Sequence, residues 1–414
     1  MRQESHVDID VGRNYARDEG WPLGVGLQEQ ASNYLKLHRL IRQWKKMQPG
    51  ASLTPSGRGK LFWGGLLFSL LTLATFWYQF HLIQAGHDVP RLDQLRWGYL
   101  ILILCLVPVE PLVLGLRMWT MCRVLQPGID FWTFFKADLA NTGVALFTPA
   151  QAGGGPGQIY ILNQGGVQLG NALTITLLGF IGTMMALLCF GLFSLLVSDI
   201  SQFGLLFTGA AVFLTSISGL MILFAFWPGL FRAVVAFVSR SVWRARGKRF
   251  PLHDWWPPED SQTGSPVDRM DLFSGRLADL FYMYQANLRR YLRHGRWNFV
   301  FVCFLSLAFL FLRCLLAYFC VRFLGLRGST PGEIFEIQIT LIFLIYLAPT
   351  PGNAGIAEGA SLWIMQNIVP LGYAPYYNLL WRFSTVYVNA TAGLILLFHR
   401  IVADVRKTSH RCVP

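Results

Sequence analysis

Residues Glu333–Ile368 have the sequence EIFEIQITLIFLIYLAPTPGNAGIAEGASLWIMQNI. The segment begins as an apolar stretch suited to a helix, which is then interrupted near its middle by Pro349, Pro351, Gly352 and Gly355. Proline lacks the amide donor that a helix needs and glycine weakens a helix, so we expect the helix to break there. Non-helical backbone is tolerated at membrane depth only where protein or a wet cavity surrounds it. The segment therefore predicts two half-helices inside a membrane bundle.

A second segment, Phe131–Leu162, has the same design and reads FWTFFKADLANTGVALFTPAQAGGGPGQIYIL. Its core Thr148–Gly153 (TPAQAG) is similar to Ala348–Asn353 (APTPGN) of the first segment. Two similar broken helices in opposite orientation are typical of inverted-repeat transporters, whose substrate site lies between the repeats near the bilayer midplane. So short a similarity can also arise by chance, and both explanations stay open at this point.

The composition and the apolar runs predict a polytopic membrane protein. Of the 414 residues, 53% are hydrophobic and only 14% are charged, whereas soluble proteins carry about 25% charged residues. A span needs about 20 apolar residues, and six stretches qualify: Leu61–Phe80, Trp97–Trp119, Ala172–Val197, Phe203–Phe226, Asn298–Leu324 and Tyr376–His399. We therefore expect an all-α bundle of six full spans and two opposed re-entrant hairpins.

The basic residues predict the orientation of the chain. Four segments hold 29 of the 35 Lys and Arg residues: those before the first span, Arg117–Lys136, Arg232–Arg296 and those from Arg400 onward. All four lie on the cytoplasmic side only if both broken segments return to the side they left, as the positive-inside rule requires. The net charge of +13 thus indicates contact with an anionic membrane surface, and we expect no nucleic acid partner.

This topology divides the chain into five parts. They are a polar cytoplasmic leader (1–60) with an amphipathic juxtamembrane segment, a first membrane half (61–227) with a hairpin at 131–163, a basic cytoplasmic loop (228–297), a second membrane half (298–400) with a hairpin at 333–368, and a cytoplasmic tail (401–414). Both termini are expected in the cytoplasm. The amphipathic segment, Leu27–Met47, is interpreted either as a helix on the membrane surface or as a solvated basic leader.

The glycine cluster of the first hairpin is a candidate anion site. Glycines let backbone N–H groups point into a cavity, and a helix N-terminus favours an anion such as a lipid headgroup. The cluster runs from Gly153 to Gly157 and leads into Gln158 and Tyr160. The alternative is that these glycines only allow close helix packing.

Four intramembrane charges follow a similar logic, because a charge at membrane depth costs about 3 kcal/mol unless it faces a partner or a cavity. Glu358 has two candidate partners, Arg313 and Arg382. Glu110 lies between Pro108 and Pro111, in a helix that we expect to be kinked. A structural ion pair and a transport role are equally open for each charge, and proton coupling through Glu110 or Glu358 is a further hypothesis.

Motifs for catalysis, metal binding or nucleotide binding are missing from the sequence. No HExxH, Ser/His/Asp pattern or P-loop occurs, and none of the seven cysteines forms a CxxC pair. We therefore expect no catalytic residue, no metal and no cofactor, with the cysteines serving as small apolar side chains.

The two hairpins resemble a known family. TPAQAGGGPGQIYILNQGGV (Thr148–Val167) resembles the first signature of the lysylphosphatidylglycerol synthase transmembrane-domain family, also called flippase-like, and the matching residues are Thr148, Pro149, Gly153, Gly154, Pro156, Gln158, Tyr160, Leu162 and Gly166. APTPGNAGIAEGA (Ala348–Ala360) resembles the second signature through Pro349, Pro351, Gly352, Gly355 and Glu358. Gly155 and Asn353 depart from the usual pattern.

The resemblance implies translocation of a lipid without its synthesis, because the transferase domain of the bifunctional members has no counterpart here. It implies a bacterial inner-membrane protein whose partners are membrane lipids with anionic headgroups. The implied substrate-binding residues are Thr148, Pro149, Gly153, Gly154, Pro156, Gln158, Tyr160, Pro351, Gly352, Asn353, Gly355 and Glu358. The alternatives are a membrane-embedded enzyme that makes glycosyl- or aminoacyl-lipids, and a non-transporting scaffold of a lipid-synthesis complex.

Overall fold

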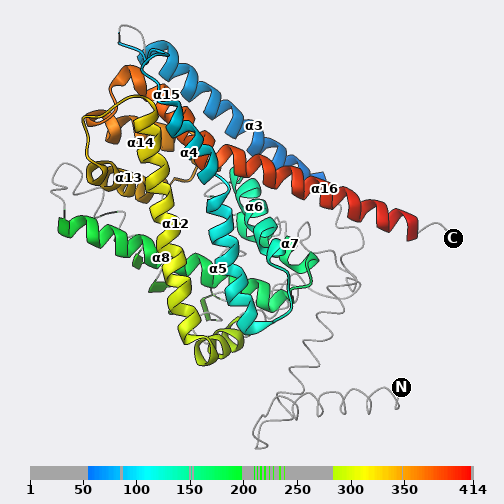
Figure 1. The fold of residues 1–414 in the computed structure, drawn as a ribbon. Coiled ribbons are helices and arrows are strands. Elements are labelled where there is room, and N and C mark those ends of the chain that lie inside the picture. Colours follow the sequence, from blue (N-terminus) through cyan, green and yellow to red (C-terminus); the bar gives the residue numbers. More distant parts are fainter. Residues whose placement is uncertain are drawn as a thin grey trace, which may run out of the picture. The chain divides into compact units, whose positions relative to one another are not determined.

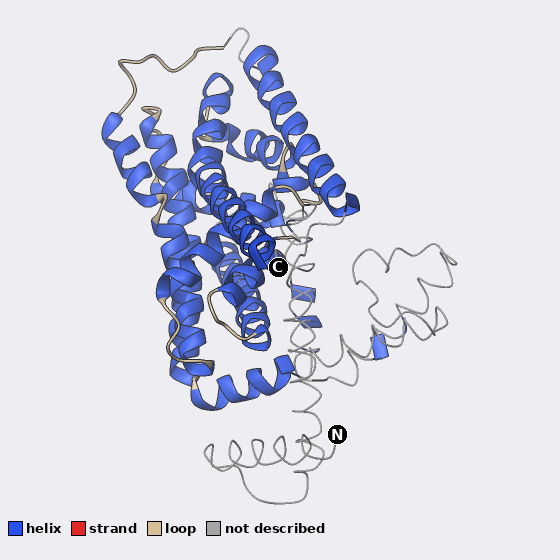
Figure 2. Cartoon of the chain, turned by 90° about the vertical axis from the view of Figure 1, so that its right-hand side faces the viewer, coloured by secondary structure: helices blue, strands red, loops and turns tan. Residues whose placement is uncertain are grey.

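The structure is a computed structural model. It describes scattered residues between 209 and 237, Gln151, and five ranges: 55–83, 87–148, 153–197, 283–346 and 348–411. Every regular element within this described part is a helix (Figures 1 and 2). The all-α class expected from the sequence is therefore confirmed for these residues.

Contacts divide the chain into two units. The larger one, Arg58–His399, contains both hairpins. The smaller one joins Met1–Gly57 to Arg400–Pro414, and its described residues, 55–57 and 400–411, are helical. The expected amphipathic segment lies outside the described residues.

The helices before residue 200 are α3 (Pro55–Tyr78), the π-turn η1 (Gln79–Ile83), α4 (Trp97–Leu106), α5 (Val109–Leu125), α6 (Phe131–Leu146), α7 (Gly154–Gln164) and α8 (Leu169–Val197). Those after residue 295 are α12 (Arg296–Phe323), α13 (Pro331–Tyr346), η5 (Pro351–Asn353), α14 (Ile356–Ile364), η6 (Met365–Asn367), η7 (Leu371–Tyr373), α15 (Ala374–Arg382), the π-turn η8 (Phe383–Tyr387) and α16 (Val388–Arg411). Residues 283–294, within the expected basic loop (228–297), are also helical.

Four helical stretches among the described residues are long and apolar enough to cross a membrane: Trp97–Leu125, Leu169–Phe190, Arg296–Phe323 and Leu371–Ala403. They overlap four of the six expected spans, with different ends. The expected span Leu61–Phe80 is helical, in α3 and η1, but is not one of these four, and most of Phe203–Phe226 lies outside the described residues. Large apolar side chains on both α3 and α12 are exposed, as a lipid-facing surface requires; Leu73 on α3 is 67% exposed and Phe304 on α12 is 61% exposed.

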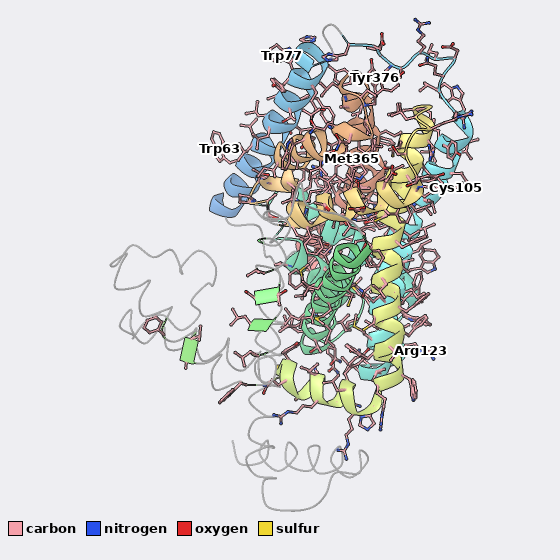
Figure 3. All side chains as sticks on the ribbon, turned by 90° about the vertical axis from the view of Figure 1, so that its left-hand side faces the viewer. Trp63, Trp77, Cys105, Arg123, Met365 and Tyr376 are labelled. Carbon is pink, nitrogen blue, oxygen red and sulfur yellow. The ribbon has the colours of Figure 1, made fainter. Side chains whose placement is uncertain are left out.

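Two ends of the larger unit can be recognised from contacts. At one end, the Arg96 amide donates to the Phe323 carbonyl (2.9 Å) and the Tyr373 hydroxyl donates to Gln94 (2.9 Å). At the other end, the Gln126 side chain joins the Gly166 carbonyl (2.9 Å) to Asn171 (3.1 Å). Figure 3 shows Arg123 at the second end, far from Trp77 and Tyr376 at the first. Among the described residues, the contacts thus group residues 94–96, 323 and 373 at one end and residues 126, 166 and 171 at the other.

The helix is interrupted just before Glu110, where we expected a kink. α4 ends at Leu106 and α5 begins at Val109, with Pro108 as its N-cap residue. Proline cannot donate the missing helical hydrogen bond, and its ring displaces the carbonyl one turn earlier. The break leaves Glu110 in the first turn of α5.

The helix α12 lies at the centre of the packing and contacts α4, α5, α8, α13 and α15. Its buried face includes Cys314, Ala317 and Cys320. Small side chains at such positions let neighbouring helices approach closely, which replaces the hydrophobic driving force that a membrane does not supply. Cys314 and Cys320 thus act as packing residues, and the cysteines that the structure describes are all free thiols.

Both expected helix breaks are confirmed. In the first hairpin, α6 ends at Leu146 and α7, which begins at Gly154, packs along it. In the second, α13 ends at Tyr346, and a short 3-10 turn precedes α14. The helices α6 and α13 both have 16 residues, and their bounds are 200 positions apart in the chain. The first helix of each hairpin therefore runs for the same length before the break.

Candidate functional site

The tip of the second hairpin uses three left-handed backbone positions: Gly352 (φ 55°), Asn353 (φ 58°) and Gly355 (φ 80°). Glycine adopts this region freely, and asparagine tolerates it better than other side chains do. A Cβ at Gly352 would lie 2.8 Å from a ring atom of Phe68 and 3.0 Å from the carbonyl oxygen of Leu146. Since Leu146 ends α6, the tip of the second hairpin packs directly against the break of the first.

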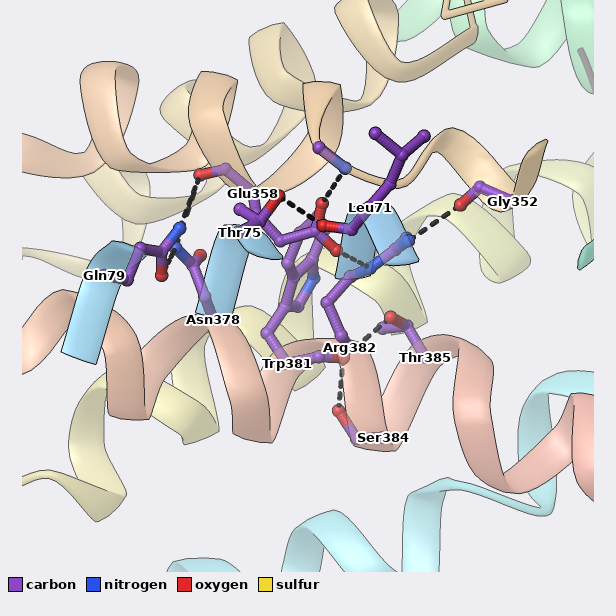
Figure 4. A network of polar contacts seen from close by, with 11 residues as sticks. Leu71, Thr75, Gln79, Gly352, Glu358, Asn378, Trp381, Arg382, Ser384 and Thr385 are labelled. Atoms are coloured by element: carbon purple, nitrogen blue, oxygen red, sulfur yellow. Dashed lines mark hydrogen bonds and ion pairs between the residues drawn. The ribbon is translucent and has the colours of Figure 1, made fainter. Parts of the chain in front are cut away.

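A buried ion pair holds this tip in place (Figure 4). The Nε of Arg382 lies 2.7 Å from Oε1 of Glu358, and the two side chains are 2% and 0% exposed. Glu358 accepts the Gly355 amide at 2.7 Å through its other oxygen, which caps α14. Arg382 donates to the Gly352 carbonyl at 2.7 Å through Nη2. The pair therefore ties α15 to the 3-10 turn within the helix break and to the first turn of α14.

Two further buried amides extend the network. The Asn378 side chain donates to Gln79 at 3.1 Å, and both amides approach the Glu358 carbonyl, at 3.4 and 3.5 Å. Within the described part of the chain, the buried Asn378 Oδ1, Ser361 Oγ and Thr350 Oγ1 have no hydrogen-bond partner. Buried polar atoms are normally satisfied, so these atoms have capacity for water or for polar groups of a ligand.

The second ion pair joins Glu110 to Arg313. Both Nε (3.1 Å) and Nη2 (2.8 Å) of Arg313 donate to Oε1 of Glu110. Arg313 is 24% exposed, and its guanidinium lies 4.9 Å from the centre of the Phe309 ring. Of the two partners expected for Glu358, Arg382 is therefore the one that the structure shows, and Arg313 belongs to Glu110.

The glycines of the first hairpin are explained mainly by packing. A Cβ at Gly154 would lie 2.1 Å from Oδ1 of Asn141 and 3.0 Å from its carbonyl oxygen. A Cβ at Gly157 would lie 2.9 Å from a Val144 methyl. Only Gly155 in this helix start has room, because the nearest atom to its Cβ would be in Thr176 at 3.8 Å. The packing alternative therefore accounts for Gly154 and Gly157.

The other expected residues of the first hairpin make contacts within that hairpin or with α5. Thr148 accepts the Gly153 amide at 2.9 Å within the turn, and Pro156 is exposed. Gln158 is buried and donates to the sulfur of Met118 (2.7 Å), and Tyr160 packs on the neighbouring apolar cluster. Pro149 lies outside the described residues, and Pro351 is buried at the second tip.

Sequence reasoning missed two buried charges, Arg117 and Asp138, which are 7% and 4% exposed. Arg117 was counted as a cytoplasmic charge, but it lies inside the bundle and donates to Thr183 (2.8 Å) and Ser306 (3.1 Å). Asp138 lies in the middle of α6. Both are charges within otherwise apolar stretches, and that is the signal which could have identified them. The remaining basic residues still predict the same orientation.

No curated protein and no solved structure shows significant similarity to this chain. A family model described as the lysylphosphatidylglycerol synthase TM region matches residues 62–393. This range includes both broken hairpins, both ion pairs and three of the four apolar stretches that can cross a membrane, and it covers the fourth, Leu371–Ala403, up to residue 393. The chain is therefore a transmembrane protein that belongs to the lysylphosphatidylglycerol synthase TM region family.

Proposed function

We propose that the protein translocates a phospholipid or a lipid-linked substrate between the two leaflets of the membrane. The headgroup passes through the polar interior of the bundle, and the acyl chains stay in the bilayer. The observation that carries the proposal is the Glu358–Arg382 pair, fully buried at the tip of a broken helix. Stability alone does not require such a pair, because apolar replacements of buried ion pairs are often neutral or stabilising.

The second hairpin is the proposed moving element. Its tip contains three residues with positive φ, and its position depends on a few polar contacts made by Glu358 and Arg382. It lies against Leu146 at the break of the first hairpin. A headgroup that competes for either charge would weaken these contacts and release the tip, which is how a ligand with different affinities for two states shifts their populations.

The membrane arrangement belongs to the same proposal. We propose six full spans, two re-entrant hairpins entering from opposite sides, and cytoplasmic termini in a bacterial inner membrane. The contacts that group residues 94–96, 323 and 373 at one end, and 126, 166 and 171 at the other, support this arrangement. Membrane lipids, in particular those with anionic headgroups, are the proposed partners, and we propose no catalytic residue, metal or cofactor.

The proposal is tested by lipid translocation in proteoliposomes. Fluorescent phospholipids are reconstituted with the full chain, and a membrane-impermeant quencher reports the fraction that reaches the outer leaflet. Wild type should accelerate flipping, and Glu358→Gln should lower the rate at least tenfold because it removes one partner of the pair. Glu333→Gln is the matched control, since Glu333 is an exposed carboxylate in the first turn of the same hairpin.

A second variant separates transport from folding. Glu358→Gln alone strands a buried guanidinium, which costs about 3–5 kcal/mol, so a loss of flipping could reflect unfolding. The double variant Glu358→Gln with Arg382→Gln removes both charges and should recover most of the thermal stability without recovering flipping. If the double variant flips as fast as wild type, the pair is structural only. If wild type flips none of a broad lipid panel, the scaffold and lipid-modifying alternatives replace transport.

A further inference from the structure

A second polar cluster combines residues of α5 and α12 with residues from the first helix of each hairpin. It contains Glu110 and Arg117 on α5, Asp138 on α6, Arg313 on α12 and Tyr346 at the end of α13. Asp138 interacts electrostatically with Glu110, Arg117 and Arg313, and Tyr346 interacts with both arginines. The two hairpins thus share one charged region that neither contains alone.

Of the four charged residues in this cluster, only two are paired with each other. Glu110 and Arg313 contact each other, as described above. Arg117 and Asp138 attract each other but do not come within the 4.0 Å of an ion pair. Within the described part of the chain, no hydrogen bond or ion pair reaches the Asp138 carboxylate, and Nε of Arg117 is buried without a partner. The structure therefore holds a buried guanidinium and a buried carboxyl group that interact electrostatically but form no ion pair with each other.

The bundle fixes Arg117 in this position. Its Nη1 donates to two hydroxyls, Thr183 on α8 and Ser306 on α12. Gly179 makes room for the guanidinium, because a Cβ there would lie 3.2 Å from Nη2. Neutral hydroxyls orient the group but do not compensate its charge, so a buried guanidinium held in this way still favours an anion.

We infer that Arg117 and Asp138 together bind the headgroup of a zwitterionic phospholipid that carries a primary amine. The guanidinium suits the phosphate, because its planar donors match phosphate oxygens. The carboxylate suits the ammonium group, which can donate up to three hydrogen bonds. A lipid with both groups would compensate both buried charges at once. This inference rests on the proposed function, and it assigns to this site a zwitterionic headgroup in place of the anionic headgroup proposed above.

The position of the pair fits this role. Asp138 is in the first helix of the first hairpin, and Tyr346 ends the first helix of the second hairpin. A headgroup at Arg117 and Asp138 would therefore lie beside both hairpins, next to the elements that the proposed cycle moves.

Binding of short-chain lipids to the purified full chain tests the inference without any transport step. Dihexanoyl phosphatidylethanolamine, phosphatidylcholine and phosphatidylglycerol are titrated in detergent by calorimetry. Wild type should bind the ethanolamine lipid at least tenfold more tightly than the glycerol lipid, because a hydrogen bond to a charged group changes affinity about ten- to hundredfold. The choline lipid, which lacks N–H donors, should bind more weakly than the ethanolamine lipid.

The variant Asp138→Asn should reduce binding of the ethanolamine lipid to the level of the glycerol lipid and should not weaken binding of the glycerol lipid. Asp130→Asn is the matched control, because it makes the same change on α6 at an exposed N-cap, where asparagine caps equally well. Soluble phosphoethanolamine is titrated as well. It should bind much more weakly than the lipid, and equal affinity would overturn the assignment to a lipid.

The wild-type comparison keeps the test decisive even if Asp138→Asn does not fold. Equal affinity of wild type for the ethanolamine and glycerol lipids would overturn the inference, whether or not the protein flips lipids. Selective binding without flipping in proteoliposomes would support the headgroup site and contradict the proposed transport.

Discussion

Gly352 shows how much depends on a single backbone position. Its φ of 55° belongs to the left-handed region, and its carbonyl accepts from Arg382. A side chain there would meet Phe68 on α3 and Leu146 on α6. Glycine at this position therefore satisfies a backbone requirement and a packing requirement together, and no other residue type satisfies both.

We predict that Gly352→Ala destabilises the protein by about 1–3 kcal/mol, because alanine is strained at this φ and its Cβ has no space. The measurement is the midpoint of thermal unfolding in detergent. Gly359→Ala is the control: its Cβ meets nothing within 4 Å in the exposed face of α14, where alanine should be neutral or stabilising. Equal midpoints for Gly352→Ala and wild type would contradict the packing described here.

The choice of partner for Glu358 could not be made from the sequence. Arg313 and Arg382 are both arginines at membrane depth, and local pattern does not distinguish them. The choice depends on how α15 lies against α14, which is a property of tertiary packing. What the sequence did predict is that Glu358 has a partner, because an unpaired carboxylate would be too costly there.

At the scale of elements, the helix breaks could be predicted and the role of the glycines could not. Proline and glycine act on their own turn of helix, so their effect can be predicted from a short segment. What a glycine touches depends on the neighbouring helix. Gly154 and Gly157 face α6 and allow it to approach, whereas the sequence favoured a headgroup site for the whole cluster.

We predict that Gly154→Leu and Gly155→Ala differ sharply. A side chain at Gly154 would collide with Asn141 and separate α7 from α6, so this variant should lose several degrees of thermal stability or fail to accumulate in the membrane. Gly155→Ala should retain the wild-type midpoint, because its Cβ would make only ordinary contact with Thr176. Similar losses in both variants would show that the cluster has a role beyond packing.

For the whole molecule, the sequence predicted the membrane class from its apolar runs and its orientation from basic residues. The class is confirmed, and the orientation remains a prediction. Arg117 shows why charge counting is imperfect. A basic residue near the end of an apolar stretch can point into the bundle when hydroxyls on two other helices accept its hydrogen bonds.

Single cysteines tested in a cysteine-free background would report the orientation. Gly328→Cys, in the loop between α12 and α13, should react with a membrane-impermeant maleimide added to intact cells. Arg293→Cys, in the helical segment before α12, should react only after the cells are opened, because the basic loop is expected in the cytoplasm. The reverse labelling pattern would contradict the proposed orientation.

The π-turn at Phe383–Tyr387 provides a way to separate the two residues of the second hairpin's ion pair, Glu358 and Arg382. A π-turn holds one more residue than an α-helical turn, and it begins directly after Arg382. If this extra residue moved one position toward the N-terminus, Arg382 would turn by about 100° around the helix axis. Glu358 would then lose its partner while α15 and α16 stayed helical. The extra residue of the π-turn thus lies next to the arginine that holds the hairpin. A shift of this extra residue along the helix would separate Arg382 from Glu358 without unwinding the helix.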